Sequence, residues 1–135
     1  MKIDLHHVHI FASDIDATIA WYRDKLGGEV RWDGDFAGAR NVFMKIGRGR
    51  LHLYDQPPRH PTGGSIHHIG IGTDDLEGLH QRLLAQGVPF RSGIREFGYA
   101  RYIMCAAPDD VLLELFEPNR EQLPEAVAAF LSGED

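Results

Sequence analysis

The sequence predicts an α+β protein made of two tandem βαβββ modules. One observation is an internal repeat: a shift of 61 residues lays Leu5–Val30 over Ser65–Val88, with His7 on His68 and a gap of one residue. A second observation is that each copy reads as a strand, a helix and three further strands. A third is the segment Gln56–Gly64, whose three prolines and two glycines separate the copies as a linker. A repeat of this length indicates a duplicated supersecondary unit.

The first module is expected over about residues 3–55. Its helix begins after the N-cap Asp14, carries an apolar stripe that includes Ile19 and Tyr22, and ends at Gly27. Alternating apolar and polar positions indicate strands on either side of it. The expected elements are a strand Ile3–Ala12, the helix, and strands Glu29–Asp33, Ala39–Ile46 and Arg50–Tyr54.

The second module is expected over about residues 65–118 and repeats this order. Its elements are a strand Ile66–Gly72, a helix from Asp74 or Asp75 to Gln86, and strands near Val88–Arg91, Ala100–Cys105 and Val111–Phe116. A terminal helix is expected over residues 121–132, where apolar side chains recur at helical spacing. Because each module is too small for a core of its own, residues 1–135 are expected to form one domain.

The composition is that of an ordinary globular protein, with 43% hydrophobic and 25% charged residues. A net charge of −6 argues against nucleic acid or an anionic membrane as a partner. A single cysteine, Cys105, excludes an intrachain disulfide and is typical of a reducing compartment. Without an apolar run of about 20 residues, and without a basic segment before an apolar one at the start, we expect a cytoplasmic protein.

Histidines are numerous, 8 in all, and strand periodicity predicts which of them share a face. On the first strand, His7 and His9 should point one way and His6 the other. On the later strands, His52 and Glu114 are equivalent in the repeat, and Glu114 lies in the apolar run VLLELF. A buried carboxylate needs a positive partner. One face carrying His7, His52, His68 and Glu114 therefore suggests a site for Fe(II), Ni(II), Zn(II) or Mn(II), although a lone strand histidine is more often an ordinary polar residue.

These patterns resemble the vicinal oxygen chelate superfamily, which includes glyoxalases, bleomycin resistance proteins and extradiol dioxygenases. The resemblance spans about residues 3 to 118. It rests on a strand histidine seven residues before a helix-opening aspartate, on a helix ending in Tyr…Leu-Gly, and on a closing strand with Asp110 where glycine is usual. The segments concerned are His7…Asp14, His68…Asp75, Ala20–Gly28 and Pro108–Pro118.

The resemblance implies curled mixed sheets that wrap a U-shaped cavity around one divalent metal ion. It implies His7, His68 and Glu114 as ligands, and places His52 where glyoxalases and epimerases carry a further Glu or Gln. That difference puts glyoxalase chemistry in doubt, because the extra carboxylate is the base usually invoked there. The short linker implies, by analogy with relatives, a homodimer with sites shared between chains.

Other side chains complete the expected site. His9 is the first candidate for proton transfer, and His52 is either a fourth ligand or a second acid–base group. Tyr54 and Tyr99 could supply hydroxyl donors to the substrate. The repeat-equivalent Arg40 and Arg101 could hold an anionic group of the substrate, or could equally be surface ion-pair partners.

Three functions follow from these residues. The first is a metal-dependent lyase or isomerase that acts on a small substrate chelated through neighbouring oxygens. The second is an Fe(II)-dependent ring- or C–C-cleaving dioxygenase, since two histidines and one carboxylate leave positions open for O₂ and substrate. The third is a metal-free antibiotic-binding resistance protein. The metal content of the purified protein separates the third from the other two.

Overall fold

The computed structural model describes residues 1–2, 6–36, 38–59, 66–97 and 100–125. Contacts divide the chain into two compact units. The first unit comprises Met1–Ser65 with Ala107–Asp110, and the second comprises Ile66–Ala106 with Val111–Asp135.

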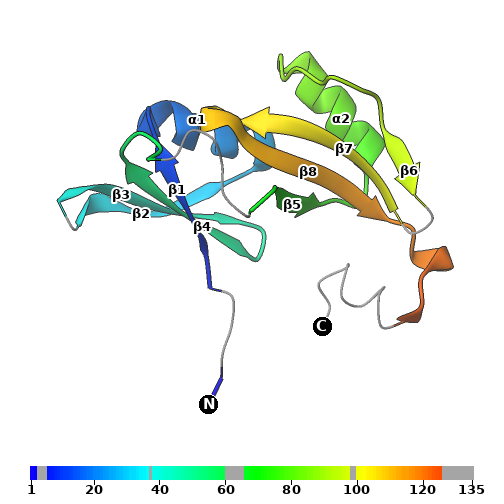
Figure 1. Ribbon diagram of the computed structural model, residues 1–135, viewed down its shortest axis with the longest axis horizontal. Coiled ribbons are helices and arrows are strands. Elements are labelled where there is room, and N and C mark those ends of the chain that lie inside the picture. The colour runs from blue at the N-terminus through cyan, green and yellow to red at the C-terminus, as the bar shows by residue number, and fades with distance from the viewer. Residues whose placement is uncertain (3–5, 37, 60–65, 98–99, 126–135) are drawn as a thin grey trace. The chain divides into compact units, whose positions relative to one another are not determined.

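The first unit holds one helix and a four-stranded mixed sheet (Figure 1). Its elements are β1 (Val8–Ala12), α1 (Ile15–Leu26), β2 (Glu29–Phe36), β3 (Ala39–Ile46) and β4 (Gly49–Asp55). The strand order is β1-β4-β3-β2. Strand β1 runs parallel to β4, and the other pairs are antiparallel. The sequence of elements is β-α-β-β-β, as the repeat predicts.

The second unit has the same plan. Its elements are β5 (Ile69–Gly72), α2 (Leu76–Ala85), β6 (Arg95–Phe97), β7 (Ala100–Ala107) and β8 (Val111–Pro118). The sheet order β5-β8-β7-β6 repeats that of the first unit, again with a parallel pair, β5 and β8. The prediction of two βαβββ modules of α+β class is therefore confirmed.

Aspartates at repeat-equivalent positions begin both helices. The Asp14 carboxylate accepts a hydrogen bond from the Ala17 amide at 3.0 Å, and the Asp75 carboxylate accepts one from the Gly78 amide at 2.9 Å. Each satisfies an amide that the first helical turn leaves without a partner. The aspartate seven residues after each strand histidine thus has a structural role.

The strand expected at Val88–Arg91 is wrong, because the corresponding strand is β6, at Arg95–Phe97. The Val88 amide donates to the Leu83 carbonyl at 2.9 Å and the Gly87 amide donates to the Leu84 carbonyl, with Gly87 at a φ of 81°. This is a Schellman ending of α2, and it uses the backbone donor that a strand would need. Val88 is buried against the core instead.

Two further boundaries differ from expectation. Strand β1 starts at Val8, so His6 and His7 precede the ladder rather than belonging to it. At the C-terminus, the described chain forms a 3₁₀ turn at Arg120–Gln122, and most of the helix expected over residues 121–132 lies outside the described residues.

Most apolar positions that agree across the repeat pack the core, although Ile71, the counterpart of Ile10, is only partly buried. Ile10, Leu51 and Leu53 are buried in the first unit, and Leu113 and Leu115 are fully buried in the second. The free thiol of Cys105 also lies in the core, where burial raises its pKa to about 11. A thiol that stays protonated at neutral pH behaves as a small apolar side chain.

The turn between β7 and β8 belongs to the first unit. Its Asp109 carboxylate accepts a hydrogen bond from the Ser13 amide at 3.0 Å and a second, short one from the Ser13 hydroxyl. Asp109 and Asp110 both have positive φ, 62° and 57°. A positive φ has a steric cost for any residue with a Cβ. The hydrogen bonds to Ser13 offset this cost for Asp109, whereas the Asp110 side chain is exposed.

Replacing these two aspartates with glycine is expected to shift stability in opposite directions. Asp110→Gly should raise the free energy of unfolding by about 0.5 kcal/mol, because glycine adopts a positive φ without steric cost. Asp109→Gly should lower it by about 1–2 kcal/mol, because the hydrogen bonds to Ser13 are lost. Urea denaturation of the two variants measures both changes. Equal shifts would contradict the role given to Asp109.

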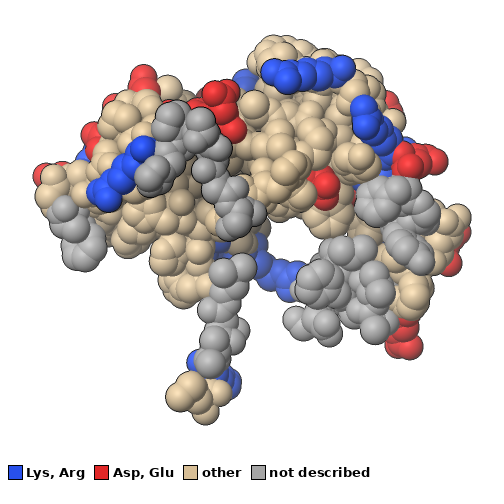
Figure 2. All heavy atoms as spheres, in the orientation of Figure 1, with Lys and Arg blue, Asp and Glu red and all other residues tan. Residues whose placement is uncertain are grey.

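The described surface does not carry a basic patch on the face drawn in Figure 2. Basic and acidic side chains are spread there among other residues, and the chain has a net charge of −6. Among the described residues, no helix has the length and hydrophobicity to cross a membrane.

Candidate functional site

A row of rings crosses the first unit's sheet. His9 on β1 pairs with His52 on β4, which pairs with Phe43 on β3, which pairs in turn with Trp32 on β2. Neighbouring ring centroids are 4.6, 4.6 and 5.0 Å apart along this row. Phe43 and Trp32 are 40% and 41% exposed, so this face carries a large ring surface that the unit itself does not bury.

The predicted residues His7, His9, His52 and Tyr54 all lie around one end of this row. The centroid of the His7 ring is 5.5 Å from that of His52, and the centroid of the Tyr54 ring is 5.7 Å from that of His9. Strand pairing explains this grouping, because the parallel register of β1 and β4 puts His9 beside His52. The sequence placed these histidines on one face from their spacing alone.

The imidazoles of His9 and His52 are held towards the neutral form. Burial, and secondly the nearby His7, lower the pKa of His9. Burial, then His9 and His7, lower the pKa of His52. A neutral imidazole can accept a proton or donate an electron pair, which are the two roles that the sequence left open for His52.

Asn41 is a site residue that the sequence analysis missed. Its side chain is 1% exposed on β3, its amide nitrogen donates to the Ala39 carbonyl at 2.9 Å, and its Oδ1 lies 2.5 Å from Nε2 of His52. Because the amide oxygen can only accept, His52 donates from Nε2, which leaves Nδ1 as its electron-pair donor in the neutral ring. The sequence gives no clear signal for it, because Asn41 is one of several polar residues in this strand.

Strand alternation predicted that His6 and His7 point to opposite faces, but their rings lie in contact. The Nδ1 atoms of the two rings are 3.0 Å apart, and the rings meet edge to face. The prediction failed because alternation applies within a ladder, and β1 begins only at Val8.

In the second unit, His68 and Glu114 approach one another. Nε2 of His68 is 3.8 Å from Oε2 of Glu114, and both side chains are partly buried, with 33% and 26% exposed. Glu114 lies opposite Gly70 across the parallel pair of β5 and β8. Gly70 stands where the first unit has His9, so the position opposite the carboxylate carries no side chain in the second unit.

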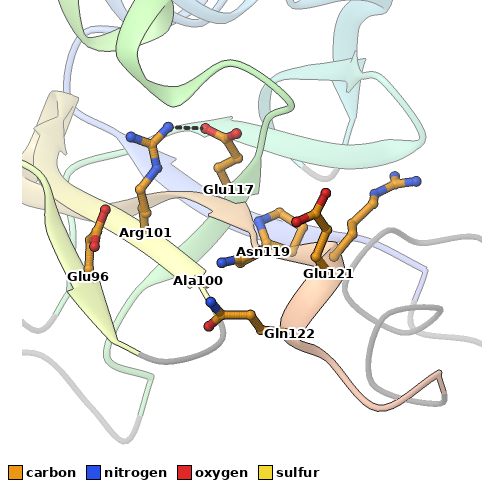
Figure 3. A pocket seen from close by; sticks show the side chains of 9 residues that line it. Glu96, Ala100, Arg101, Glu117, Asn119, Glu121 and Gln122 are labelled. Atoms are coloured by element: carbon orange, nitrogen blue, oxygen red, sulfur yellow. Dashed lines mark hydrogen bonds and ion pairs between the residues drawn. The ribbon is translucent and has the colours of Figure 1, made fainter.

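The two arginines predicted to bind substrate face the helices. Arg101 shares a strand face with the buried Ile103 and donates to Glu117 at 2.8 Å, and the same Glu117 oxygen accepts from the Leu76 amide at the start of α2 (Figure 3). The Leu76 hydrogen bond first, and Arg101 after it, lower the pKa of Glu117. This ion pair borders a polar pocket of about 370 Å³ at the end of β8.

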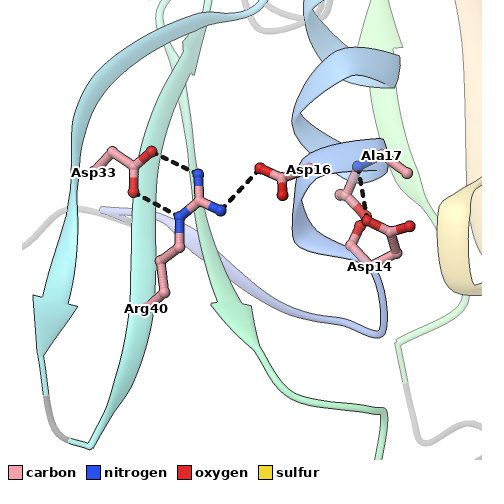
Figure 4. Close-up of polar contacts among 6 residues, drawn as sticks. Asp14, Asp16, Ala17, Asp33 and Arg40 are labelled. Atoms are coloured by element: carbon pink, nitrogen blue, oxygen red, sulfur yellow. Dashed lines mark hydrogen bonds and ion pairs between the residues drawn. The ribbon is translucent and has the colours of Figure 1, made fainter.

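Arg40 has the equivalent position in the first unit. Its guanidinium donates twice to Asp33 and once to Asp16 on α1, each at 2.8 Å (Figure 4). These bonds raise its pKa further above the ordinary range. Arg40 therefore joins α1 to the sheet, and Arg101 pairs with the carboxylate that accepts from the start of α2, which favours the alternative of ion-pair partners. Tyr99, the remaining predicted substrate contact, lies outside the described residues.

Comparison with known proteins confirms the resemblance. The model of the Glyoxalase/Bleomycin resistance protein/Dioxygenase superfamily matches residues 4–115. The chain belongs to this superfamily. A comparison with curated proteins found no match.

Several solved structures of the superfamily have the same fold. The fosfomycin resistance protein FosX of Listeria monocytogenes, as a variant in complex with Mn(II) and dihydroxypropylphosphonic acid, is 20% identical with a TM-score of 0.75, over 90% of this chain and 97% of that one. A glyoxalase family protein of Enterococcus faecalis is 27% identical with a TM-score of 0.71, over 84% and 97%. TnmS3, an antibiotic-binding protein of Streptomyces, is 24% identical with a TM-score of 0.75, over 88% and 99%.

His68 and Glu114, which the resemblance implies as ligands, have donor atoms of the kind that divalent ions bind. Two bonds of roughly 2.1 Å can span the separation of Nε2 of His68 and Oε2 of Glu114, which is 3.8 Å. An imidazole with a carboxylate is the donor set that borderline divalent ions prefer. Taken alone, the described parts of the chain bring no three His, Cys, Asp or Glu side chains together as a metal-binding group. The pair in the second unit therefore offers two of the donors that such an ion would need.

Proposed function

We propose that the protein is a divalent-metal-dependent enzyme of lyase or isomerase type, acting on a small substrate through neighbouring oxygens. The observation that carries the proposal is the approach of His68, which immediately precedes β5, to Glu114 on the paired strand β8. The family resemblance adds His7 as the third ligand, and Fe, Ni, Zn and Mn all suit such a set. That ligand could come from the same chain or from a second copy in a homodimer.

The residues around this set have distinct tasks. When bound, a divalent ion would act as a Lewis acid towards the two substrate oxygens. His9, whose pKa is lowered by burial, is the general base that takes a proton from the substrate at its free ring nitrogen. His52 is oriented by Asn41 and presents Nδ1, as a further ligand or as a second proton acceptor. Tyr54, close to His9, orients the substrate through its hydroxyl.

A second candidate is an antibiotic-binding protein. The exposed rings of Trp32 and Phe43 favour it, because planar drugs stack on such surfaces. TnmS3 is described as an antibiotic-binding protein, and this chain has its fold. Such a binder would not need the His68–Glu114 pair.

Elemental analysis of protein purified without chelator distinguishes these candidates. The enzyme proposal predicts close to one divalent ion per chain, and it would be overturned if no metal bound even after Mn, Fe, Ni and Zn salts were added. The antibiotic-binding candidate would then stand. If iron predominates, oxygen uptake with catechols tests the dioxygenase alternative, whereas isomerisation of hemithioacetals tests glyoxalase-type chemistry.

A further inference from the structure

Adjacent histidines precede the first strand of both modules and make the same contact twice. In the first unit, Nδ1 of His6 lies 3.0 Å from Nδ1 of His7; in the second, Nδ1 of His67 lies 2.9 Å from Nδ1 of His68. The ring centroids are 5.2 Å apart in each pair, at interplanar angles of 88° and 83°. Two independent copies of one geometry indicate a local motif rather than an accident of one surface.

A contact between two Nδ1 atoms restricts the tautomers of both rings. A neutral imidazole carries its proton on one nitrogen and an electron pair on the other, so one ring of each pair must donate from Nδ1 and its partner must accept. The donor ring then has its electron pair on Nε2. The accepting ring has the opposite tautomer, with its proton on Nε2.

We propose that His6 and His67 are positioning residues, which accept the Nδ1 proton of His7 and His68 and so fix Nε2 of those two rings as electron-pair donors. The assignment of His7 and His68 as the donors rests on the proposed function, in which they are ligands. An electron pair on Nε2 is what a ligand requires, and a hydrogen bond from the other nitrogen orients the ring and raises its basicity.

The surroundings of Nε2 support this direction. In the second unit, Nε2 of His68 faces Glu114 at 3.8 Å, which is longer than a hydrogen bond, so a proton on this nitrogen is not held by the carboxylate in this geometry. In the first unit, the His7 ring instead packs against His52. The Nδ1 contact is the same in both units although the other nitrogen has different neighbours, so the adjacent histidine sets the ring orientation.

The tautomer can be measured without any metal. Long-range nitrogen–proton NMR spectra of the metal-free full chain, at about pH 8.5 where ordinary imidazoles are neutral, are expected to show His68 with its proton on Nδ1. His67→Phe retains the ring but removes the acceptor, and should shift His68 towards the Nε2-protonated form. His67→Asn offers an amide oxygen as acceptor and should preserve the Nδ1 proton. Parallel substitutions of His6 report on His7.

Metal affinity provides the second readout. Calorimetric titration with Zn(II) should show a loss of about 10–100-fold for His67→Phe and a change within about threefold for His67→Asn. A wild-type His68 protonated on Nε2, or a tautomer unchanged by His67→Phe, would overturn the inference. If the tautomer is as expected but the wild type binds no metal, the inference stands and the proposed function fails. Unchanged thermal unfolding of the variants shows that their effects are local, as expected for exposed residues.

Discussion

Glu114→Gln is expected to reduce the metal content of the purified protein from close to one ion per chain to less than about a tenth of that value. Removing a carboxylate ligand eliminates both a bond to the ion and the negative charge that offsets its burial. The substitution preserves the size of a side chain that lies between the buried Leu113 and Leu115, so the core of β8 should remain intact. Elemental analysis, with circular dichroism to verify folding, measures the effect.

A matched control is Glu121→Gln, which removes the same charge from an exposed position after β8. It should retain full metal content, because its carboxylate is not in the ligand set. An equal loss in the two variants would mean that metal uptake depends on general surface charge. No loss in either would remove Glu114 from the set and leave His68 without its partner.

Asn41→Ala is expected to lower the free energy of unfolding by about 2 kcal/mol. The buried amide satisfies His52 and the Ala39 carbonyl, and its removal leaves both with an unpaired polar group. Guanidinium denaturation of wild type and variant measures the loss. An effect below about 0.5 kcal/mol, the size usual for surface substitutions, would contradict the structural role given to Asn41.

A double-mutant cycle isolates the bond between Asn41 and His52. His52→Phe removes the ring nitrogens and keeps a ring beside Phe43. If the hydrogen bond is real, the double variant loses at least about 0.5 kcal/mol less than the sum of the single losses, whereas independent residues add within about 0.3–0.5 kcal/mol. Strict additivity would contradict the orientation of His52 by Asn41.

The repeat made the architecture predictable from the sequence. Strand and helix order follow from side-chain period, and the caps at Asp14 and Asp75 follow from their residue type at helix starts. Because the two copies share one order of elements, each predicted element is supported by its counterpart in the other copy. The same logic identified the buried positions Leu53 and Leu115.

Features that depend on a single boundary or on a diagonal contact were not predictable in this way. The orientation of His6 depends on where β1 starts, and the alternation of side chains along a strand does not reveal its first residue. The position of β6 depended on Val88 ending the helix rather than opening a strand. Asn41 contacts His52 diagonally on the neighbouring strand, because its direct register partner is Tyr54. Spacing along the chain therefore does not indicate the contact.

The modules diverged most on the faces that carry the candidate site. His9 and Phe11 in the first correspond to Gly70 and Gly72 in the second, where a Cβ added to either glycine would meet the Phe116 ring at ordinary contact distance. At these two positions the first module therefore carries rings, and the second carries glycines packed against Phe116.

Crystals of the protein grown with Mn(II), with anomalous diffraction measured, test the central claim most directly. The account predicts one anomalous peak per chain, within bonding distance of Nε2 of His7, Nε2 of His68 and a carboxylate oxygen of Glu114, whether one chain or two contribute them. A peak bound elsewhere, or no peak at saturating Mn(II), would contradict it.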